Sequence, residues 1–136
     1  MNSISLESAA FSPPFNHLPT PFHLYSETRA LEDARDLSEG LRHYLPTLEL
    51  YFSTKTNALV PLLKALLGQG WGLEVVCPGD RRAAALAGAV GKQLLLNGPA
   101  WAKTELEDAL FAQEVAQITL DSLSSAEQVG QALRYS

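Results

Sequence analysis

The stretch Leu48-Glu49-Leu50-Tyr51-Phe52-Ser53-Thr54-Lys55 decides the fold of this chain. Apolar and polar side chains alternate along residues 48–55, which predicts a β-strand with one apolar and one polar face. Leucines at helical spacing follow over residues 59–67, and glycines at positions 68 and 70 end that segment. A strand that leads directly into an amphipathic helix is the building unit of α/β folds.

Three more strand–helix units follow the first. Their strands are predicted at residues 73–77, 93–96 and 115–120. Their helices are predicted at residues 81–89, at 104–112 and from 124 onward. The last two helices are predicted to begin with capping boxes, formed by Thr104 with Glu107 and by Ser124 with Glu127. Alternating strands and helices of this kind form parallel sheets with right-handed crossovers.

The segment before the first unit is less regular. Residues 1–19 are rich in Ser and Pro and predict an irregular leader, so that the folded domain covers residues 20–136. Residues 21–25 alternate apolar and polar side chains, which predicts a short strand. Ser26 then caps a helix that Pro46 ends.

Two architectures fit four such units. One is a small complete doubly wound domain, and the other is the first half of an eight-stranded (β/α)8 TIM-type barrel. Periodicity alone does not choose between them. One face of the predicted strands carries polar or small side chains, namely Ser53, Lys55, Glu74 and Asn97. We therefore predict an α/β half barrel, with four parallel strands in sequential order and helices only on the outside.

Composition limits the possible function classes. The chain has 136 residues, of which 46% are hydrophobic, and a formal net charge of −5, as expected for one globular domain. The single cysteine, Cys77, excludes a disulfide scaffold and fits a reducing compartment. The sequence shows no basic cluster, no long apolar run, no signal peptide and no metal-ligand spacing among its histidines. We therefore predict a cytoplasmic protein without a nucleic-acid partner, a membrane partner or a metal.

Lys55 is the residue of the opening stretch that most suggests chemistry. It shares the polar strand face with Ser53 and lies at the carboxyl end of a parallel strand, where α/β folds place their active sites. Partial desolvation would supply a neutral amine, which condenses with carbonyl groups. Glu74, on the inward face of the next strand, is the second candidate. On pattern alone, a solvated strand-end lysine and a structural ion pair remain the alternatives.

The sequence motifs around Lys55 resemble those of a known family. Thr20-Pro21-Phe22-His23-Leu24-Tyr25, a helix, and then Leu50 to Asn57 are similar to the opening of the pyridoxal-phosphate decarboxylases of the diaminopimelate and ornithine decarboxylase family. Further motifs similar to those of the family follow in the same order along the chain, at Gly72 to Asp80, at Asn97-Gly98-Pro99 and at Leu120-Asp121-Ser122. The chain departs from the family pattern in having Ser53-Thr54 before the lysine, Glu74 on the second strand, and Cys77 and Asp80 after it. The resemblance extends from residue 20 to about residue 133.

This resemblance implies a function. It implies that Lys55 forms a Schiff base with pyridoxal 5′-phosphate (PLP), that Lys55 and Glu74 belong to the cofactor-binding site, and that the substrate is an amino acid. It also implies a complete barrel and a β-domain, with a homodimer in the full-length form. We therefore expect an amino-terminal portion of such a decarboxylase, not active by itself. The alternative is a non-catalytic α/β binding or interaction domain of the same fold. The related alanine-racemase type is less similar, since Ala58-Leu59-Val60 follows Asn57.

Overall fold

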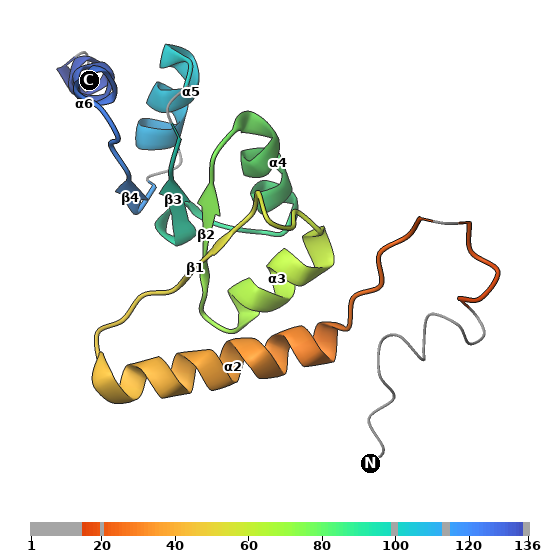
Figure 1. The fold of residues 1–136 in the computed structure, drawn as a ribbon. Helices are drawn as coiled ribbons and strands as arrows, with labels where there is room; N and C mark the ends of the chain where they lie inside the picture. The colour runs from red at the N-terminus through yellow and green to blue at the C-terminus, as the bar shows by residue number, and fades with distance from the viewer. Residues whose placement is uncertain (1–14, 20, 99–100, 113–114, 135–136) are drawn as a thin grey trace.

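The computed structural model describes residues 15–19, 21–98, 101–112 and 115–134 (Figure 1). A long helix comes first, and strands and helices then alternate to the end of the described chain. The elements are α2 (Glu27–Tyr44), β1 (Tyr51–Ser53), α3 (Val60–Gly68), β2 (Gly72–Val75), α4 (Pro78–Leu86), the 3-10 turn η1 (Gly91–Gln93), β3 (Leu94–Leu96), α5 (Lys103–Glu107), the π-helical turn η2 (Asp108–Ala112), β4 (Gln117–Ile118) and α6 (Leu123–Arg134). The four strand–helix units predicted from the sequence are confirmed.

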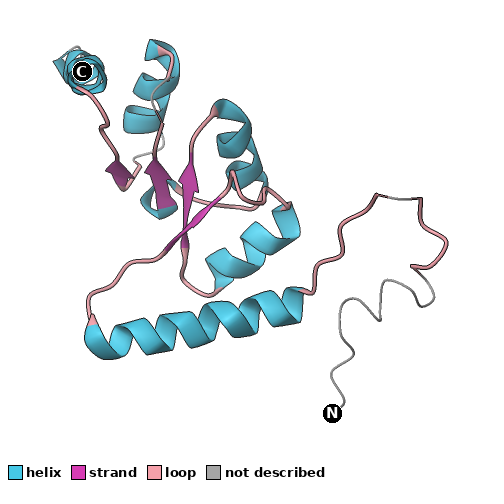
Figure 2. Ribbon diagram, viewed as in Figure 1, coloured by secondary structure: helices cyan, strands magenta, loops and turns pink. Residues whose placement is uncertain are grey.

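The four strands form one parallel sheet in the order β1-β2-β3-β4 (Figure 2). Ser53 pairs with Glu74, Glu74 pairs with Leu95, and Leu95 pairs with Gln117, so these four side chains belong to one face of the sheet. A doubly wound domain would reverse the strand order at a switch point. The sequential order therefore confirms the half-barrel prediction over the doubly wound alternative.

The helices pack against the opposite face of the sheet. Leu73 and Val75 of β2 and Leu94 and Leu96 of β3 are buried in one cluster with apolar side chains from α3, α4, α5 and α6. Ser53, Glu74 and Leu95, which have the opposite parity, are only half-buried. All four following helices thus cover the same side of the sheet, as in the outer ring of a barrel. The other face of the sheet, which we call the concave face, carries the polar side chains.

Helix α2 packs against α3 rather than over the sheet, as Figure 1 shows. Ser26 caps it as predicted, because its Oγ accepts a hydrogen bond from the Arg29 backbone N–H at 3.3 Å. Ala34 of α2 lies in a second apolar cluster with Leu66 of α3 and Trp71. Trp71 Nε1 donates a hydrogen bond of 3.1 Å to Ser38 Oγ, which fixes α2 to the start of β2.

Three local predictions are wrong. Residues 21–25 belong to no strand: Phe22 and Leu24 are half-buried and His23 and Tyr25 are exposed, but this alternating segment pairs with no described strand. The helix predicted at residues 81–89 begins earlier, as α4 at Pro78, since proline is accommodated at the first helical position. The predicted caps are displaced by two residues, because Glu105 rather than Glu107 accepts from the Ala102 N–H, at 3.1 Å, and Ser122 with Ser125 caps α6.

Residues 1–14 of the predicted leader lie outside the described residues. Within the part that is described, Leu18 N–H donates to the Phe15 carbonyl at 3.0 Å in a turn. Among the described residues, no helix combines the length and apolarity needed to cross a bilayer.

Candidate functional site

Three polar side chains from three neighbouring strands meet at the carboxyl edge of the sheet. Ser53 ends β1, Glu74 lies in β2, and Asn97 directly follows β3. The Asn97 N–H donates to the Val75 carbonyl at 2.9 Å, so that the ladder between β2 and β3 continues through this residue. Asn97 Nδ2 donates a hydrogen bond to Glu74 Oε1. We call Ser53, Glu74 and Asn97 the edge cluster.

The edge cluster favours the ionised form of Glu74. The pKa of its carboxyl group is lowered from 4.5, first by the Ser53 hydroxyl and then by the Asn97 amide, while partial burial opposes this shift. The Ser53 Oγ atom is enclosed and does not reach the geometry of a full hydrogen bond, yet it lies near enough to stabilise the negative charge. Lys55 makes a further, smaller contribution through its positive charge.

Lys55 lies in the turn that immediately follows β1, at the same edge. Its side chain is exposed, and it acts on Glu74 through space rather than as one of the direct ion pairs identified among the described residues. The residue before it, Thr54, is 1% exposed and holds the turn in place. The Thr54 N–H donates to the Glu74 carbonyl at 3.0 Å, and its hydroxyl donates to the same oxygen at 2.7 Å. The backbone that carries Lys55 is therefore fastened to Glu74.

The structure thus brings together the two site residues predicted from the sequence, Lys55 and Glu74, while their roles stay a prediction. Sequence reasoning missed the anchoring by Thr54 and the hydrogen bond from Asn97. A signal for Thr54 was present, because strand parity turns it toward the helices, where a hydroxyl group needs a partner. The Asn97 bond depends on the backbone directly after β3, where Gly98 has a φ of +119°, and could not be read from spacing.

Two other polar residues, Asp80 and Cys77, lie near this edge. Asp80 Oδ2 accepts a hydrogen bond of 3.0 Å from the Val76 N–H and lies in the first turn of α4, where an acid is favourable. Cys77 is the residue preceding α4 and is exposed with a free thiol. Among the described residues, no group of three or more His, Cys, Asp or Glu side chains is arranged to hold a metal ion.

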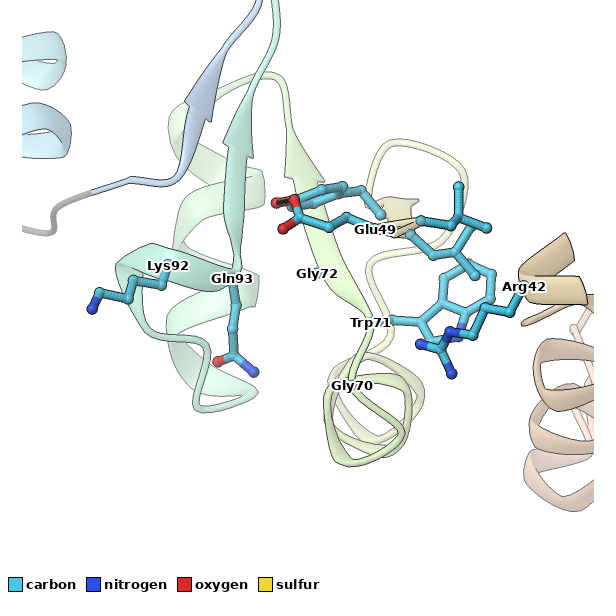
Figure 3. A pocket seen from close by; sticks show the side chains of 10 residues that line it. Arg42, Glu49, Gly70, Trp71, Gly72, Lys92 and Gln93 are labelled. Carbon is cyan, nitrogen blue, oxygen red and sulfur yellow. Dashed lines mark hydrogen bonds between the residues drawn. The ribbon is translucent and has the colours of Figure 1, made fainter. Parts of the chain in front are cut away.

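A hollow of about 170 Å³ lies at the other end of the strands (Figure 3). Its lining includes Arg42, Glu49, Tyr51, Trp71 and Gln93. Tyr51 OH donates to Glu49 at 3.2 Å, and Gln117 of β4 donates to the same carboxylate oxygen at 3.3 Å. Burial, followed by the Glu49 charge and hydrogen bond, raises the pKa of Tyr51. Because this hollow is at the amino-terminal ends of the strands, it is no extension of the Lys55 site.

The fold and the edge cluster define part of a (β/α)8 barrel with a lysine at the carboxyl end of its first strand. No family model matches the chain. The diaminopimelate decarboxylase of Deinococcus radiodurans is 31% identical over 121 residues, which cover 87% of this chain and 30% of that protein.

Solved structures of decarboxylases share the fold. The diaminopimelate decarboxylase of M. jannaschii in complex with L-lysine superimposes with a TM-score of 0.74 at 20% identity, over 85% of this chain and 27% of that one. The Selenomonas ruminantium lysine decarboxylase SrLDC, in complex with PLP and cadaverine, superimposes with a TM-score of 0.72 at 22% identity, over 97% of this chain and 33% of that one. The chain is therefore similar to PLP-dependent decarboxylases of this type and spans about 30% of the curated relative's length. An amino-terminal portion of such a protein fits, as the sequence predicted.

Proposed function

We propose that this chain is the lysine-bearing portion of a PLP-dependent amino-acid decarboxylase and that Lys55 forms the Schiff base with the cofactor. The observation that carries the proposal is the position of Lys55. It directly follows β1, on backbone that Thr54 fastens to Glu74, at the edge where barrel enzymes place their chemistry. The sequence likeness to a diaminopimelate decarboxylase supports the same choice of reaction.

The residues at this edge fit a carbonyl cofactor. Lys55 is exposed at the carboxyl edge of the sheet, and Ser53 is small enough to leave room beside it. The enclosed Ser53 hydroxyl lies near the Glu74 carboxylate and helps to keep it ionised, so the negative charge beside the Lys55 amine is maintained. PLP, when bound, supplies the electron sink that makes loss of carbon dioxide from an α-carbon possible.

Each residue at the edge then has a separate task. Lys55 provides the amine that bonds to the cofactor carbonyl. Thr54 keeps the lysine backbone at a constant position relative to β2, because its two hydrogen bonds end on one carbonyl oxygen. Glu74 presents a negative charge to the ammonium group of Lys55 whenever that group is protonated.

We further propose that the 136 residues alone bind the cofactor weakly and do not decarboxylate. With four strands, the concave face stays open to water, whereas catalysis of this kind depends on a site that excludes it. Homodimerisation of a full-length form and a cytoplasmic location belong to the same proposal.

The test is a chimera in which residues 20–134 replace the matched segment of the D. radiodurans enzyme. We expect decarboxylation of diaminopimelate, with loss of that activity in the Lys55→Ala chimera. Lys64→Ala, on the exposed side of α3, is the matched control and should keep the activity. A folded chimera whose activity is unaffected by Lys55→Ala would refute the proposal. A folded chimera with no activity would favour the non-catalytic binding domain.

A further inference from the structure

Asn97 is held to β2 by two hydrogen bonds, one from its backbone and one from its side chain. Its backbone N–H donates to the Val75 carbonyl at 2.9 Å, and its side-chain amide donates to the carboxylate of Glu74. Val75 and Glu74 both belong to β2. Two contacts to β2, one from the backbone and one from the side chain, leave the amide little freedom. The direction of the amide is therefore fixed by the sheet rather than chosen by solvent.

The next residue reinforces this placement. Gly98 has a φ of +119°, and a Cβ at this position would lie 2.8 Å from Val76 Cγ1 and 3.0 Å from the Val76 carbonyl oxygen. The backbone can take this conformation and lie this close to Val76 only because residue 98 is glycine.

The carboxylate that Asn97 holds is the one to which Lys55 is coupled. Thr54 fastens the turn carrying Lys55 to the Glu74 carbonyl, and the Lys55 charge acts on the Glu74 carboxylate. Glu74 thus makes both contacts. Its side chain is held by Asn97, and its backbone carbonyl holds the turn that carries Lys55. A rotation of the Glu74 side chain would change the distance between the two charges, and hence their coupling, without moving the backbone of Lys55.

We propose that Asn97 is a positioning residue, which holds the Glu74 carboxylate in a fixed orientation beside Lys55. Its importance for a reaction rests on the proposed function, because Lys55 is taken there as the reacting amine. The geometry itself requires no cofactor. Asn97 acts only through Glu74, and the enclosed Ser53 hydroxyl supports the carboxylate from the other side.

The experiment measures the coupling between Lys55 and Glu74 in the complete chain. The pKa of Glu74 is followed by carbon-13 NMR of its carboxyl group, with and without Lys55→Met. We expect the Lys55 substitution to raise the Glu74 pKa in the wild-type background and to have at most half that effect in Asn97→Ala. Asn97→Ala alone should raise the Glu74 pKa by about 0.5 to 1 pH unit, since a hydrogen bond to the charged form is lost.

A matched control is available on the same face of the sheet. Gln117 donates to Glu49 as Asn97 does to Glu74, but at the opposite end, so Gln117→Ala should leave the Lys55–Glu74 coupling unchanged. Asn97→Leu is close in size, adds no charge beside Glu74, and serves if the alanine variant fails to fold. An unchanged coupling in either folded Asn97 variant overturns the proposal. Failure of Lys55 to react with PLP, with the coupling still dependent on Asn97, would refute the proposed function and leave this inference standing.

Discussion

The hydrogen bond between Trp71 and Ser38 should be the main polar contact that keeps α2 attached. Both side chains are buried, at 8% and 6% exposure, so water cannot replace a lost partner. Ser38→Ala removes the acceptor and leaves the indole N–H enclosed and unpaired. An unsatisfied buried donor costs about 1 to 3 kcal/mol, and we expect the free energy of unfolding to fall by that amount.

Trp71→Phe removes the donor instead. Ser38 Oγ then keeps its other hydrogen bond, in which it donates to the Ala34 carbonyl at 2.7 Å, so its hydroxyl stays satisfied. The single Trp71 variant also loses apolar contact area, and a double-mutant cycle separates this loss from the hydrogen bond. We expect the double variant to be more stable than the sum of the single effects predicts, by about 1 kcal/mol.

The assay is urea unfolding followed by far-ultraviolet circular dichroism, because fluorescence would change with the tryptophan itself. The four proteins should share one slope of free energy against denaturant, which shows that the same surface is exposed on unfolding. Additive effects within about 0.3 to 0.5 kcal/mol would refute the reasoning. Such additivity would mean that α2 is held by apolar packing alone.

Three further predictions follow from single side chains. Because the folded pKa of Glu74 lies below 4.5, its stabilising contribution is complete at higher pH and is lost as the pH falls through the folded value. Urea unfolding at neutral and acidic pH should therefore show that the free energy of unfolding falls less on acidification in Glu74→Gln than in the wild type. An equal fall in both proteins would contradict this. Glu49→Gln should lower the pKa of Tyr51 toward 10.0, measured by carbon-13 NMR of labelled tyrosine, since a negative neighbour is removed but burial remains; no downward movement would show that burial alone sets it. Gly98→Ala should destabilise the fold by more than about 1 kcal/mol, because residue 98 has a φ of +119°. Gly130→Ala, in α6 with nothing within 4 Å of the added Cβ, should stabilise it by about 0.5 to 1 kcal/mol. Thermal unfolding compares the two variants, and equal effects would contradict the requirement for glycine at position 98.

The strand–helix order could be predicted because apolar periodicity indicates the type of each element and the face that it buries. Leu73 and Val75 alternate with Glu74, and the sheet buries the first two against helices while leaving the acid on the concave face. Residues 21–25 show the same alternation and form no strand. A strand needs a neighbour to satisfy its backbone, and alternation in one segment carries no information about that neighbour.

The site was only partly predictable for a similar reason. Placement of Lys55 and Glu74 at one edge follows from parallel strands, whose carboxyl ends meet. The hydrogen bond from Asn97 and the two hydrogen bonds from Thr54 depend on the backbone path directly after β3 and β1. Residue spacing does not reveal that path. The caps predicted at residues 104 and 124 failed in the same way, since several Ser, Thr and Glu residues near each of these positions compete to cap the helix.

The central claim is that Lys55 is the amine that reacts with the cofactor, and reductive labelling tests it most directly. The chain is incubated with PLP, reduced with borohydride and mapped by peptide mass spectrometry, with Lys64 and Lys92 as internal controls on α3 and η1. We predict labelling that is below one equivalent but concentrated at Lys55. Label spread evenly over the lysines, or concentrated at another one, would contradict the account.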